Sequence, residues 1–535
     1  MFTRIKTLSL NLIVYGMGDV AVQAVGFLLL PLFTHILTPG DYGVLALLMT
    51  VELVTKIVFR FGIDASFMRL YYDCHDHASR QRLASTIFLF LLATNGTVLV
   101  VALAATPALA HHVFEDGGHG LALAIVLVNT FVGGFFFIPF HVLRIQGRSL
   151  KFSTLTFSRA ACTTALRVLL IAGPIAHLRV LGFVLADIIV TFALGLALLP
   201  SFVRLIRPTF SFAILREALR FGVPRVPHGV AQQVIGPGTD PALLRIFLPV
   251  ADAAAREEKI GVYNIGATFG TTLKLFLSAF EYAWAPFYFA TMKASDAKRT
   301  FSRVTTYGMA ILVLMAAGLG ASASDLIRGA TQPGYFQAAR VVPWIAIGVT
   351  FQGVYLLTSI GLNITKHTEY YPVATGIAAG VNIAFNALLI PRYGILGPAY
   401  SNVISYAVLA SVSLYFSQRF YPISYEWGRL GRIVLAGVAG YLLATLPLPA
   451  RMFAPLGVLV RGAIVLAAYV ACLAVTGFFR PRELVRLRQL ARQLRSTRAA
   501  RTSIEEEEEE EAATGGDDKA TLGRRDAGDR ADRLQ

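Results

Sequence analysis

Charge-poor stretches of 18 or more residues recur along almost the whole chain, and they limit what it can fold into. A helix of that length crosses the roughly 30 Å hydrocarbon layer of a membrane. The 535 residues are 55% hydrophobic and 15% charged, whereas soluble proteins average about 25% charged residues. The sequence therefore predicts an all-α integral membrane protein with about fourteen transmembrane helices.

The predicted spans follow one another from residue 8 to residue 478. The least regular is interrupted by Pro224, Pro227 and Pro237, and a membrane helix tolerates proline only where other groups satisfy the freed backbone. The first span is too long for a signal-peptide core, so we expect it to stay in the mature protein. The spans are 8–37, 42–63, 83–110, 119–143, 152–176, 180–203, 218–237, 260–290, 303–325, 340–363, 369–390, 395–417, 430–449 and 454–478.

Successive connections between the predicted spans are alternately rich and poor in Lys and Arg. With the N-terminus inside, twenty of these residues fall in inside connections and eight in outside ones. Because basic residues are retained on the cytoplasmic side, we predict a multi-pass protein of the cell inner membrane with both termini cytoplasmic. Loops 64–82 and 291–300 are predicted inside, and loops 111–118 and 328–339 outside. The same bias, with attraction to anionic lipid heads, accounts for the net charge of +16 without nucleic acid.

Two stretches resemble each other at an offset of about 215–218 residues, so that Gly43 aligns with Gly261 and Gly182 with Gly397. Six spans separate the copies, which makes the repeat parallel. It predicts two parallel six-helix lobes, formed by spans 1–6 and 7–12, around a central cavity, plus two extra helices. Chance similarity of Gly- and Pro-punctuated loops is the alternative. The predicted boundaries are 1–207, 208–420, 421–480 and 481–535.

The last of these segments is a cytoplasmic tail that is basic and then acidic. Arginines run from Arg480 to Arg501, and Glu505 to Glu511 follow. A composition of charged residues with Gly and Ala cannot bury a core, so we expect residues 502–535 to be disordered. The run Cys74-His75-Asp76-His77 is too crowded for a structural zinc site, and no metal or cofactor is predicted.

Seven basic residues lie within the predicted spans, at least three residues from either end. Facing lipid at mid-depth, each would cost about 2.5–3.5 kcal/mol, so most must face water, each other or a membrane edge. Intervals of four, seven or eight residues place several of them on one side of their helices, and Asn382 and Asn386 share a side likewise. These stripes predict a central hydrophilic cavity. The seven are Lys56, Arg60, Arg159, Arg167, Arg225, Lys274 and Arg461.

A cationic cavity suits an anionic substrate, because a guanidinium group pairs bidentately with phosphate oxygens. The alternative for each residue is that it locks helices together, as Glu52 could with Lys56. Arg60 can also reach the cytoplasmic surface, and Arg461 lies in the extra helices. We predict substrate contacts from Lys56, Arg60, Arg159, Arg167, Arg225 and Lys274. Ion coupling or charge pairing is predicted for Asp19, Glu52, Asp187 and Glu281.

Several motifs carry a family resemblance over roughly residues 1–480. The most specific is Leu388-Leu389-Ile390-Pro391-Arg392-Tyr393-Gly394-Ile395-Leu396-Gly397. The others are Leu28-Leu29-Leu30-Pro31-Leu32, Leu37-Thr38-Pro39-Gly40-Asp41-Tyr42-Gly43, Phe221-Gly222-Val223-Pro224 and Gly261-Val262-Tyr263-Asn264. In these motifs the chain resembles bacterial polysaccharide biosynthesis flippases, the O-antigen repeat-unit translocases of the multidrug/oligosaccharidyl-lipid/polysaccharide (MOP) exporter superfamily.

The resemblance implies a two-lobed cavity that opens alternately to each side of the membrane. The sugar-diphosphate head of a polyprenyl carrier would cross through it while the tail stays in lipid, with the basic residues as candidate diphosphate ligands. The implied partners are the polyprenyl-diphosphate-linked glycan, membrane lipids, a polysaccharide polymerase and glycosyltransferases. The acidic tail and the long outside loop at 238–260 depart from the family pattern.

Three other functions make different predictions. A MATE-like drug/cation antiporter of the same superfamily would favour an acidic or aromatic cavity. A membrane glycosyltransferase or polymerase would need clustered catalytic carboxylates in a large outside loop, or a cytoplasmic domain. A scaffold would have no use for polar stripes. The sequence also has no G-x-x-x-x-G-K-[ST] run for ATP, so a transporter rather than an enzyme is predicted.

Overall fold

The computed structural model describes residues 25–60, 62–114, 118–173, 178–446 and 454–480. This part of the chain consists of helices and their connections, without a strand. Of these described residues, those up to Tyr469 form one compact unit, and those from Val470 onward belong to a second. Asp19, most of the first predicted span and the tail from 481 onward lie outside the described residues.

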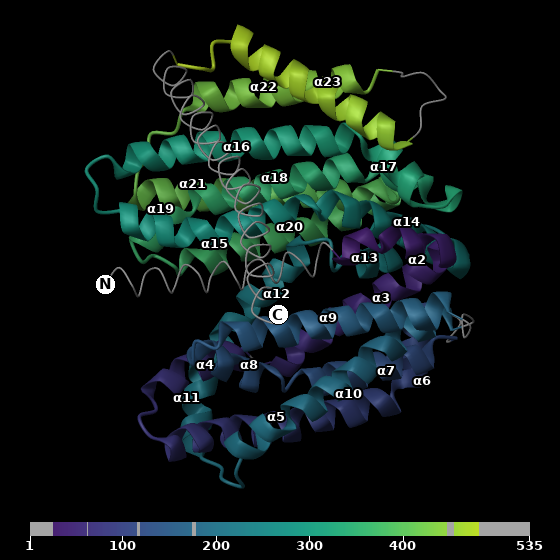
Figure 1. Cartoon of the computed structure of the whole chain (residues 1–535), viewed down its shortest axis with the longest axis vertical. Helices are drawn as coiled ribbons and strands as arrows, with labels where there is room; N and C mark the ends of the chain where they lie inside the picture. Colours follow the sequence, from purple (N-terminus) through teal and green to yellow (C-terminus); the bar gives the residue numbers. More distant parts are fainter. Residues whose placement is uncertain (1–24, 61, 115–117, 174–177, 447–453, 481–535) are drawn as a thin grey trace, which may run out of the picture. The chain divides into compact units, whose positions relative to one another are not determined.

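A first group of helices, the N-terminal lobe, extends from α3 to α10 and is drawn in purple to blue in Figure 1. The short helix α2 (Leu30–Ile36) precedes it. The helices of the lobe are α3 (Pro39–Arg60), α4 (Ile63–Asp73), α5 (His77–Ala104), α6 (Thr106–Phe114), α7 (Gly120–Gly133), α8 (Phe137–Ile145), α9 (Ser149–Ala172) and α10 (Arg179–Leu205).

A second group, the C-terminal lobe, extends from α13 to α21 and is drawn in teal to green. Two further helices follow it, α22 (Trp427–Ala444) and α23 (Ala454–Val475). The helices of the lobe are α13 (Asp240–Phe247), α14 (Ala253–Thr271), α15 (Leu273–Thr291), α16 (Ala297–Ala321), α17 (Ala323–Ala330), η2 (Pro333–Arg340), α18 (Val342–Thr358), α19 (Ile360–Ile364), α20 (Tyr370–Tyr393) and α21 (Leu396–Phe420).

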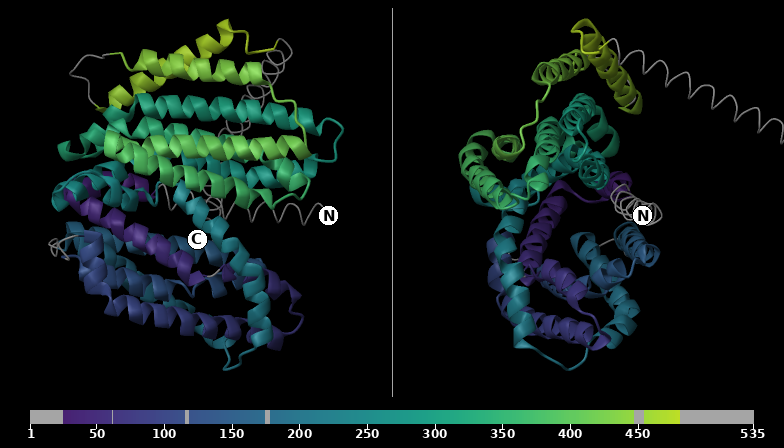
Figure 2. Two further views of the ribbon diagram at one scale, coloured as in Figure 1. Left: turned by 180° about the vertical axis from the view of Figure 1, so that it is seen from behind. Right: turned by 90° about the vertical axis from the view of Figure 1, so that its left-hand side faces the viewer.

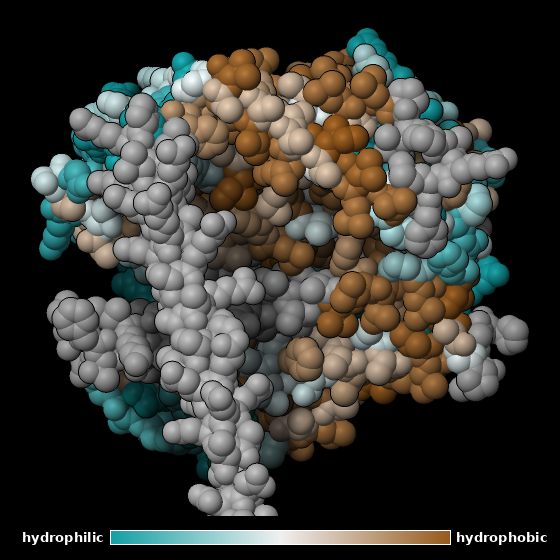
Figure 3. Space-filling view, turned by 45° about the horizontal axis from the view of Figure 1, so that its top comes forward, coloured by the Kyte–Doolittle hydropathy of each residue, from teal (hydrophilic) through white to brown (hydrophobic). Residues whose placement is uncertain are grey.

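Ten helices in the described residues are long and apolar enough to cross a membrane, which confirms the predicted class of fold. The spans predicted at 218–237 and 260–290 are each broken into two helices, and the one at 430–449 is not among the ten. The number fourteen therefore stays a prediction. Figure 3 shows apolar side chains across the middle of one face and hydrophilic ones toward both edges, as expected for a surface in lipid.

The motif around Thr38 begins α3. The Thr38 backbone N–H donates to the Asp41 carboxylate at 2.9 Å, and the Asp41 N–H donates to the Thr38 hydroxyl at 3.2 Å. This reciprocal arrangement is a capping box with Pro39 in the first turn. Farther along the chain, Asp76 caps α5 by accepting from Ser79 N–H at 3.1 Å, and the hydrogen bonds from Ser79 lower the pKa of Asp76. Asp76 thus has a structural role in its loop.

The two lobes meet where α3 crosses α14. A Cβ atom on Gly261 would lie 1.8 Å from the Pro39 carbonyl oxygen, and one on Gly43 would lie 1.9 Å from the Glu257 carbonyl oxygen. No side chain fits at either position, because real Cβ contacts are never this short. The two glycines that align in the sequence repeat therefore form the two sides of one helix crossing.

Polar contacts close to this crossing also connect the lobes. The Tyr335 hydroxyl donates to the Leu37 carbonyl oxygen at 2.8 Å. The Thr34 hydroxyl donates to the Ala330 carbonyl oxygen at 2.8 Å, and the Gln332 amide donates to the Thr34 carbonyl oxygen at 2.8 Å. These residues all lie at helix ends that the Lys/Arg distribution predicts to be outside.

The interrupted span at 218–237 links the two lobes. It consists of α11 (Phe212–Gly222), the 3-10 turn η1 (Val223–Arg225) and α12 (Val226–Ile235). Helix α11 packs against α4 and α5, whereas α12 packs mainly against α20, and Figure 2 shows the teal segment running from one group to the other. Pro224 and Pro227 lie at the break, because proline lacks the N–H that a continuous helix needs.

Candidate functional site

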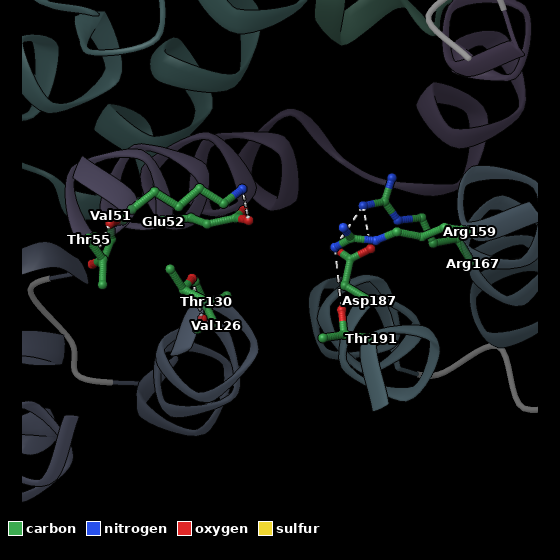
Figure 4. A network of polar contacts seen from close by, with 10 residues as sticks. Val51, Glu52, Thr55, Val126, Thr130, Arg159, Arg167, Asp187 and Thr191 are labelled. Atoms are coloured by element: carbon green, nitrogen blue, oxygen red, sulfur yellow. Dashed lines mark hydrogen bonds and ion pairs between the residues drawn. The ribbon is translucent and has the colours of Figure 1, made fainter. Parts of the chain in front are cut away.

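The N-terminal lobe holds a polar cluster between α9 and α10 (Figure 4). The Arg167 guanidinium donates to both carboxylate oxygens of Asp187, at 2.8 and 2.7 Å. Its carbon also lies 3.6 Å from the centre of the Phe183 ring. One guanidinium nitrogen thus contacts both carboxylate oxygens, and this ion pair and a cation–π contact hold the side chain in place. Both charged side chains keep about a quarter of their surface exposed, 23% and 26%.

Arg159 lies two turns before Arg167 on the same helix. Its guanidinium is 3.5 Å from the Thr191 hydroxyl, which is a weak contact. No carboxylate pairs with it among the described residues. In Figure 4 the Arg159 side chain and Glu52 of α3 point toward the same space. Arg159 is therefore a partly buried cation whose charge is not neutralised by an ion pair.

Two predicted residues of α3 form ion pairs with carboxylates close to them in the sequence. Lys56 lies 2.5 Å from Glu52 of the same helix, and Arg60, the last residue of α3, lies 3.7 Å from Asp64 in the first turn of α4. The Lys56 and Arg60 side chains are 47% and 45% exposed, so these pairs contribute little to stability. Both cations remain accessible to an anionic ligand.

The other predicted residues lie apart from this cluster. Arg225 is exposed in η1 and stacks on Phe221, 4.2 Å from the ring centre. Lys274 begins α15 and has no hydrogen bond or ion pair in the described part of the chain. Arg461 donates to Asp325 at 2.7 Å and also to the Ala444 carbonyl oxygen, which fits the helix-locking alternative.

The C-terminal lobe repeats the Arg167–Asp187 contact with neutral residues. Asn382 donates to Asn402 at 3.3 Å, and these two residues lie 20 positions apart, as Arg167 and Asp187 do. The offset between the two pairs matches the offset of the sequence repeat. The contact thus recurs at equivalent positions within each lobe, between two charged side chains in the N-terminal lobe and between two amides in the C-terminal lobe.

Asp240 extends this neutral cluster and was not predicted as a site residue. Its carboxylate is fully buried, and it accepts from Asn402 at 2.7 Å and from the Tyr263 hydroxyl. It also interacts electrostatically with Lys274. The second carboxylate oxygen has no hydrogen-bond partner among the described residues. The sequence could not identify Asp240 as a site residue because it lies in a predicted connection between spans. Only the folded structure shows that α13 packs against Asn402.

A pocket opens within the C-terminal lobe, at helix ends that are predicted to be inside. Its volume is about 270 Å³. Four aromatic rings contribute to its wall, together with a carboxylate, an imidazole and amide and hydroxyl groups. We call it the C-lobe pocket, and its polar and aromatic lining residues are His228, Glu281, Trp284, Tyr288, Tyr355, Ser359, Asn363 and Tyr371.

Two lobes of membrane-spanning helices, with a cationic cluster in one and a polar pocket in the other, define a polytopic membrane protein. The chain belongs to the polysaccharide biosynthesis protein family, which matches residues 32–328. It has the fold of the MOP superfamily. The two solved structures with this fold that are described below are a flippase and a multidrug transporter.

Two solved structures show the same fold. The lipid II flippase MurJ, in an inward closed conformation, is 15% identical with a TM-score of 0.67, and the match covers 86% of this chain and 98% of MurJ. An inward-facing multidrug resistance MATE family transporter is 13% identical with a TM-score of 0.52, over 77% of this chain and 95% of that one. An uncharacterised membrane protein of Methanocaldococcus jannaschii is 25% identical over 139 residues, which are 25% of this chain and 27% of that protein.

Proposed function

We propose that this protein flips polyprenyl-diphosphate-linked oligosaccharide repeat units across the bacterial inner membrane for surface polysaccharide biosynthesis. The observation that carries the proposal is Arg159, a cation that lies within a membrane-spanning helix without a carboxylate partner. Asp187 and Glu52 act on Arg159 only from beyond ion-pair distance. A charge at such a position without a close anion is costly, and a diphosphate would supply one. Membership of the polysaccharide biosynthesis protein family supports a glycan as the rest of the head group.

In the proposed cycle, the head group binds from the cytoplasmic side, and the two lobes then separate on the outer side. The diphosphate binds Arg159 and the exposed Lys56 from the cytoplasmic side, while the polyprenyl tail stays in the bilayer. The contacts near Tyr335 and Leu37 then separate, and the head group leaves on the outer side. Both termini are cytoplasmic in this proposal, and glycosyltransferases and a polymerase act before and after the flipping step.

Flipping in reconstituted vesicles tests the role of Arg159. The Arg159→Ala variant should lower the initial rate of flipping of a fluorescent short-chain polyprenyl-diphosphate glycan at least about tenfold, because one charge-assisted hydrogen bond to the diphosphate contributes about 1.5–3 kcal/mol. Arg392→Ala is the matched control, since Arg392 is exposed in a predicted outside connection. Equal rates in both variants would remove Arg159 from the substrate path.

A MATE-like drug/cation antiporter is the second candidate, and the C-lobe pocket favours it. Glu281 has no ion-pair partner in the described residues, and aromatic rings surround it, as a cation site requires. Efflux of a fluorescent organic cation from vesicles separates the two functions. Cation efflux that Glu281→Gln abolishes and Arg159→Ala leaves intact would establish the antiporter and overturn the flippase proposal.

A further inference from the structure

The C-lobe pocket contains polar groups that no other part of the described chain satisfies. The Glu281 carboxylate and the Tyr355 hydroxyl make no hydrogen bond there. His228 uses Nδ1 for a 2.9 Å contact with the Thr375 hydroxyl, which leaves its Nε2 uncommitted. The indole nitrogen of Trp284 is buried without a partner. The pocket therefore offers both donors and acceptors to a ligand.

The aromatic rings of the pocket have fixed positions. Trp284 is only 3% exposed and packs edge-on against Tyr288, with 5.9 Å between ring centres. Tyr355 and Tyr371 lie 6.2 Å apart and nearly perpendicular. The Tyr371 hydroxyl also donates to the Ser359 carbonyl oxygen at 3.1 Å. Rings that are already held in place lose little conformational entropy when a flat ligand packs on them.

We propose that the C-lobe pocket binds one neutral sugar ring of the glycan. This inference rests on the proposed function and adds a specificity site to it. A pyranose presents apolar C–H faces to aromatic rings and hydroxyl groups around its edge, and these hydroxyls both donate and accept. A single carboxylate beside histidine, tyrosine and asparagine matches that pattern.

Glu281 determines which sugars the pocket accepts. Its carboxylate can accept from one or two sugar hydroxyls, and such charge-assisted hydrogen bonds are the strong ones. A uronic acid would bring a second carboxylate next to it, and no Lys or Arg of the described residues lines the pocket to compensate. The pocket therefore admits a neutral ring and rejects an acidic one by charge repulsion.

The position of the pocket fits loading from the cytoplasm. Tyr288 lies near the end of α15, and Ser359 and Tyr371 lie beside the connection that contains Lys366. These helix ends are predicted inside, where the glycan is assembled in the proposed function. The sugar is thus recognised before the outer contacts between the lobes separate.

Tryptophan fluorescence tests this inference without transport. The full-length variant Trp344→Phe, Trp427→Phe leaves Trp284 as the only one of the chain's three tryptophans. The probes are a short-chain polyprenyl diphosphate carrying glucose, the same lipid carrying glucuronic acid, and the lipid without sugar. We expect the glucose probe to shift the emission and to bind about tenfold more tightly than the other two.

Two variants sharpen the test. Glu281→Gln in this background should reduce the preference for glucose over glucuronic acid to less than about threefold, because the amide removes the repulsion. Tyr355→Ala should weaken glucose binding about tenfold, whereas Tyr415→Ala, an exposed tyrosine of α21 outside the pocket, should not. Equal binding of all three probes with unchanged emission would overturn the sugar site, as would displacement of the glucose probe by an organic cation.

These experiments distinguish failure of the sugar site from failure of the proposed flippase function. If Arg159→Ala flips normally while glucose still binds at Trp284, the diphosphate route is wrong and the sugar site stands. If flipping depends on Arg159 while Glu281→Gln and Tyr355→Ala bind the probes as the parent protein does, the sugar site is wrong and the flippase stands.

Discussion

Arg159 and Arg167 lie two turns apart on one side of α9, yet their neighbours give them different roles. Asp187 pairs with Arg167 and Phe183 covers it. Arg159 makes no ion pair among the described residues: it has a weak hydrogen bond to Thr191, and Asp187 and Glu52 act on it from farther away. Removing one member of a buried ion pair leaves the other charge uncompensated. Two roles are thus open for Arg167: it locks α9 to α10 through Asp187, or it contacts the substrate. Replacing both members of the pair, and not one alone, can distinguish these roles.

The Asn382–Asn402 contact of the C-terminal lobe suggests which substitution can distinguish helix locking from substrate contact. Arg167→Asn alone should lower stability by about 2 kcal/mol, because it leaves the partly exposed Asp187 without its cation. The double variant Arg167→Asn, Asp187→Asn copies the neutral Asn382–Asn402 contact and should restore thermal stability. Fluorescence-detected thermal unfolding in detergent measures both effects.

Flipping by the same double variant then decides the role of Arg167. If the pair only locks α9 to α10, transport should return together with stability. Restored stability with transport still lost at least about tenfold would assign Arg167 to the substrate path. A double variant as unstable as Arg167→Asn would contradict the equivalence of the two pairs.

At this scale the sequence could predict which residues matter but not how they pair. Spacing placed Arg159 and Arg167 on one side of a helix, and the structure agrees. It could not assign Asp187 to Arg167 and leave Arg159 unpaired, because that choice depends on the packing of α9 against α10. Asp240 was missed for the same reason, since a connection gives no periodicity from which burial can be inferred.

Among the helices, the crossing of α3 and α14 tolerates substitution least. Gly261→Leu would drive a side chain into the Pro39 backbone, so the helices must separate at a cost of about 3 kcal/mol. Gly376→Leu is the matched control, because a Cβ there has no neighbour within 4 Å. We expect a lower unfolding temperature and yield only for Gly261→Leu. Equal behaviour of the two variants would mean that the crossing opens without cost.

Hydropathy predicted the positions of the membrane-spanning helices well and their continuity less well. The breaks at Pro224 and Pro227 could be expected from the missing backbone donors. The break between α14 and α15 at Thr272 has only Gly270 nearby, and a single glycine is tolerated inside a helix and does not predict a break. Apolar composition shows that a segment lies in the membrane but does not show whether its helix is straight.

For the molecule as a whole, orientation is the first property to test. In a cysteine-free background we expect a membrane-impermeant thiol reagent, added from the periplasm, to label Gln337→Cys and not Ser295→Cys. Both positions are exposed, and the positive-inside bias places them on opposite sides. The reverse labelling pattern would invert the topology and move the C-lobe pocket to the outer side.

The sequence repeat predicted two lobes. Gly43 and Gly261 give a physical reason why glycine stands at the same position of both copies. Close backbone approach excludes every side chain, so the same residue type is needed in both copies. The C-lobe pocket had no such signal, because its lining residues come from several helices. Only Glu281 was predicted there, and its surroundings depend on the tertiary fold.

The break at Val223–Arg225 also has a mechanical consequence. Helix α11 packs with one lobe and α12 with the other, so this turn is the covalent joint between them. Two prolines have already removed hydrogen bonds that a straight helix would contain. The backbone hydrogen bonds that remain here include those from Val223 N–H to the Leu219 carbonyl and from Val226 N–H to the Val223 carbonyl. Bending therefore breaks fewer bonds than it would in a straight helix, and the joint can act as a hinge.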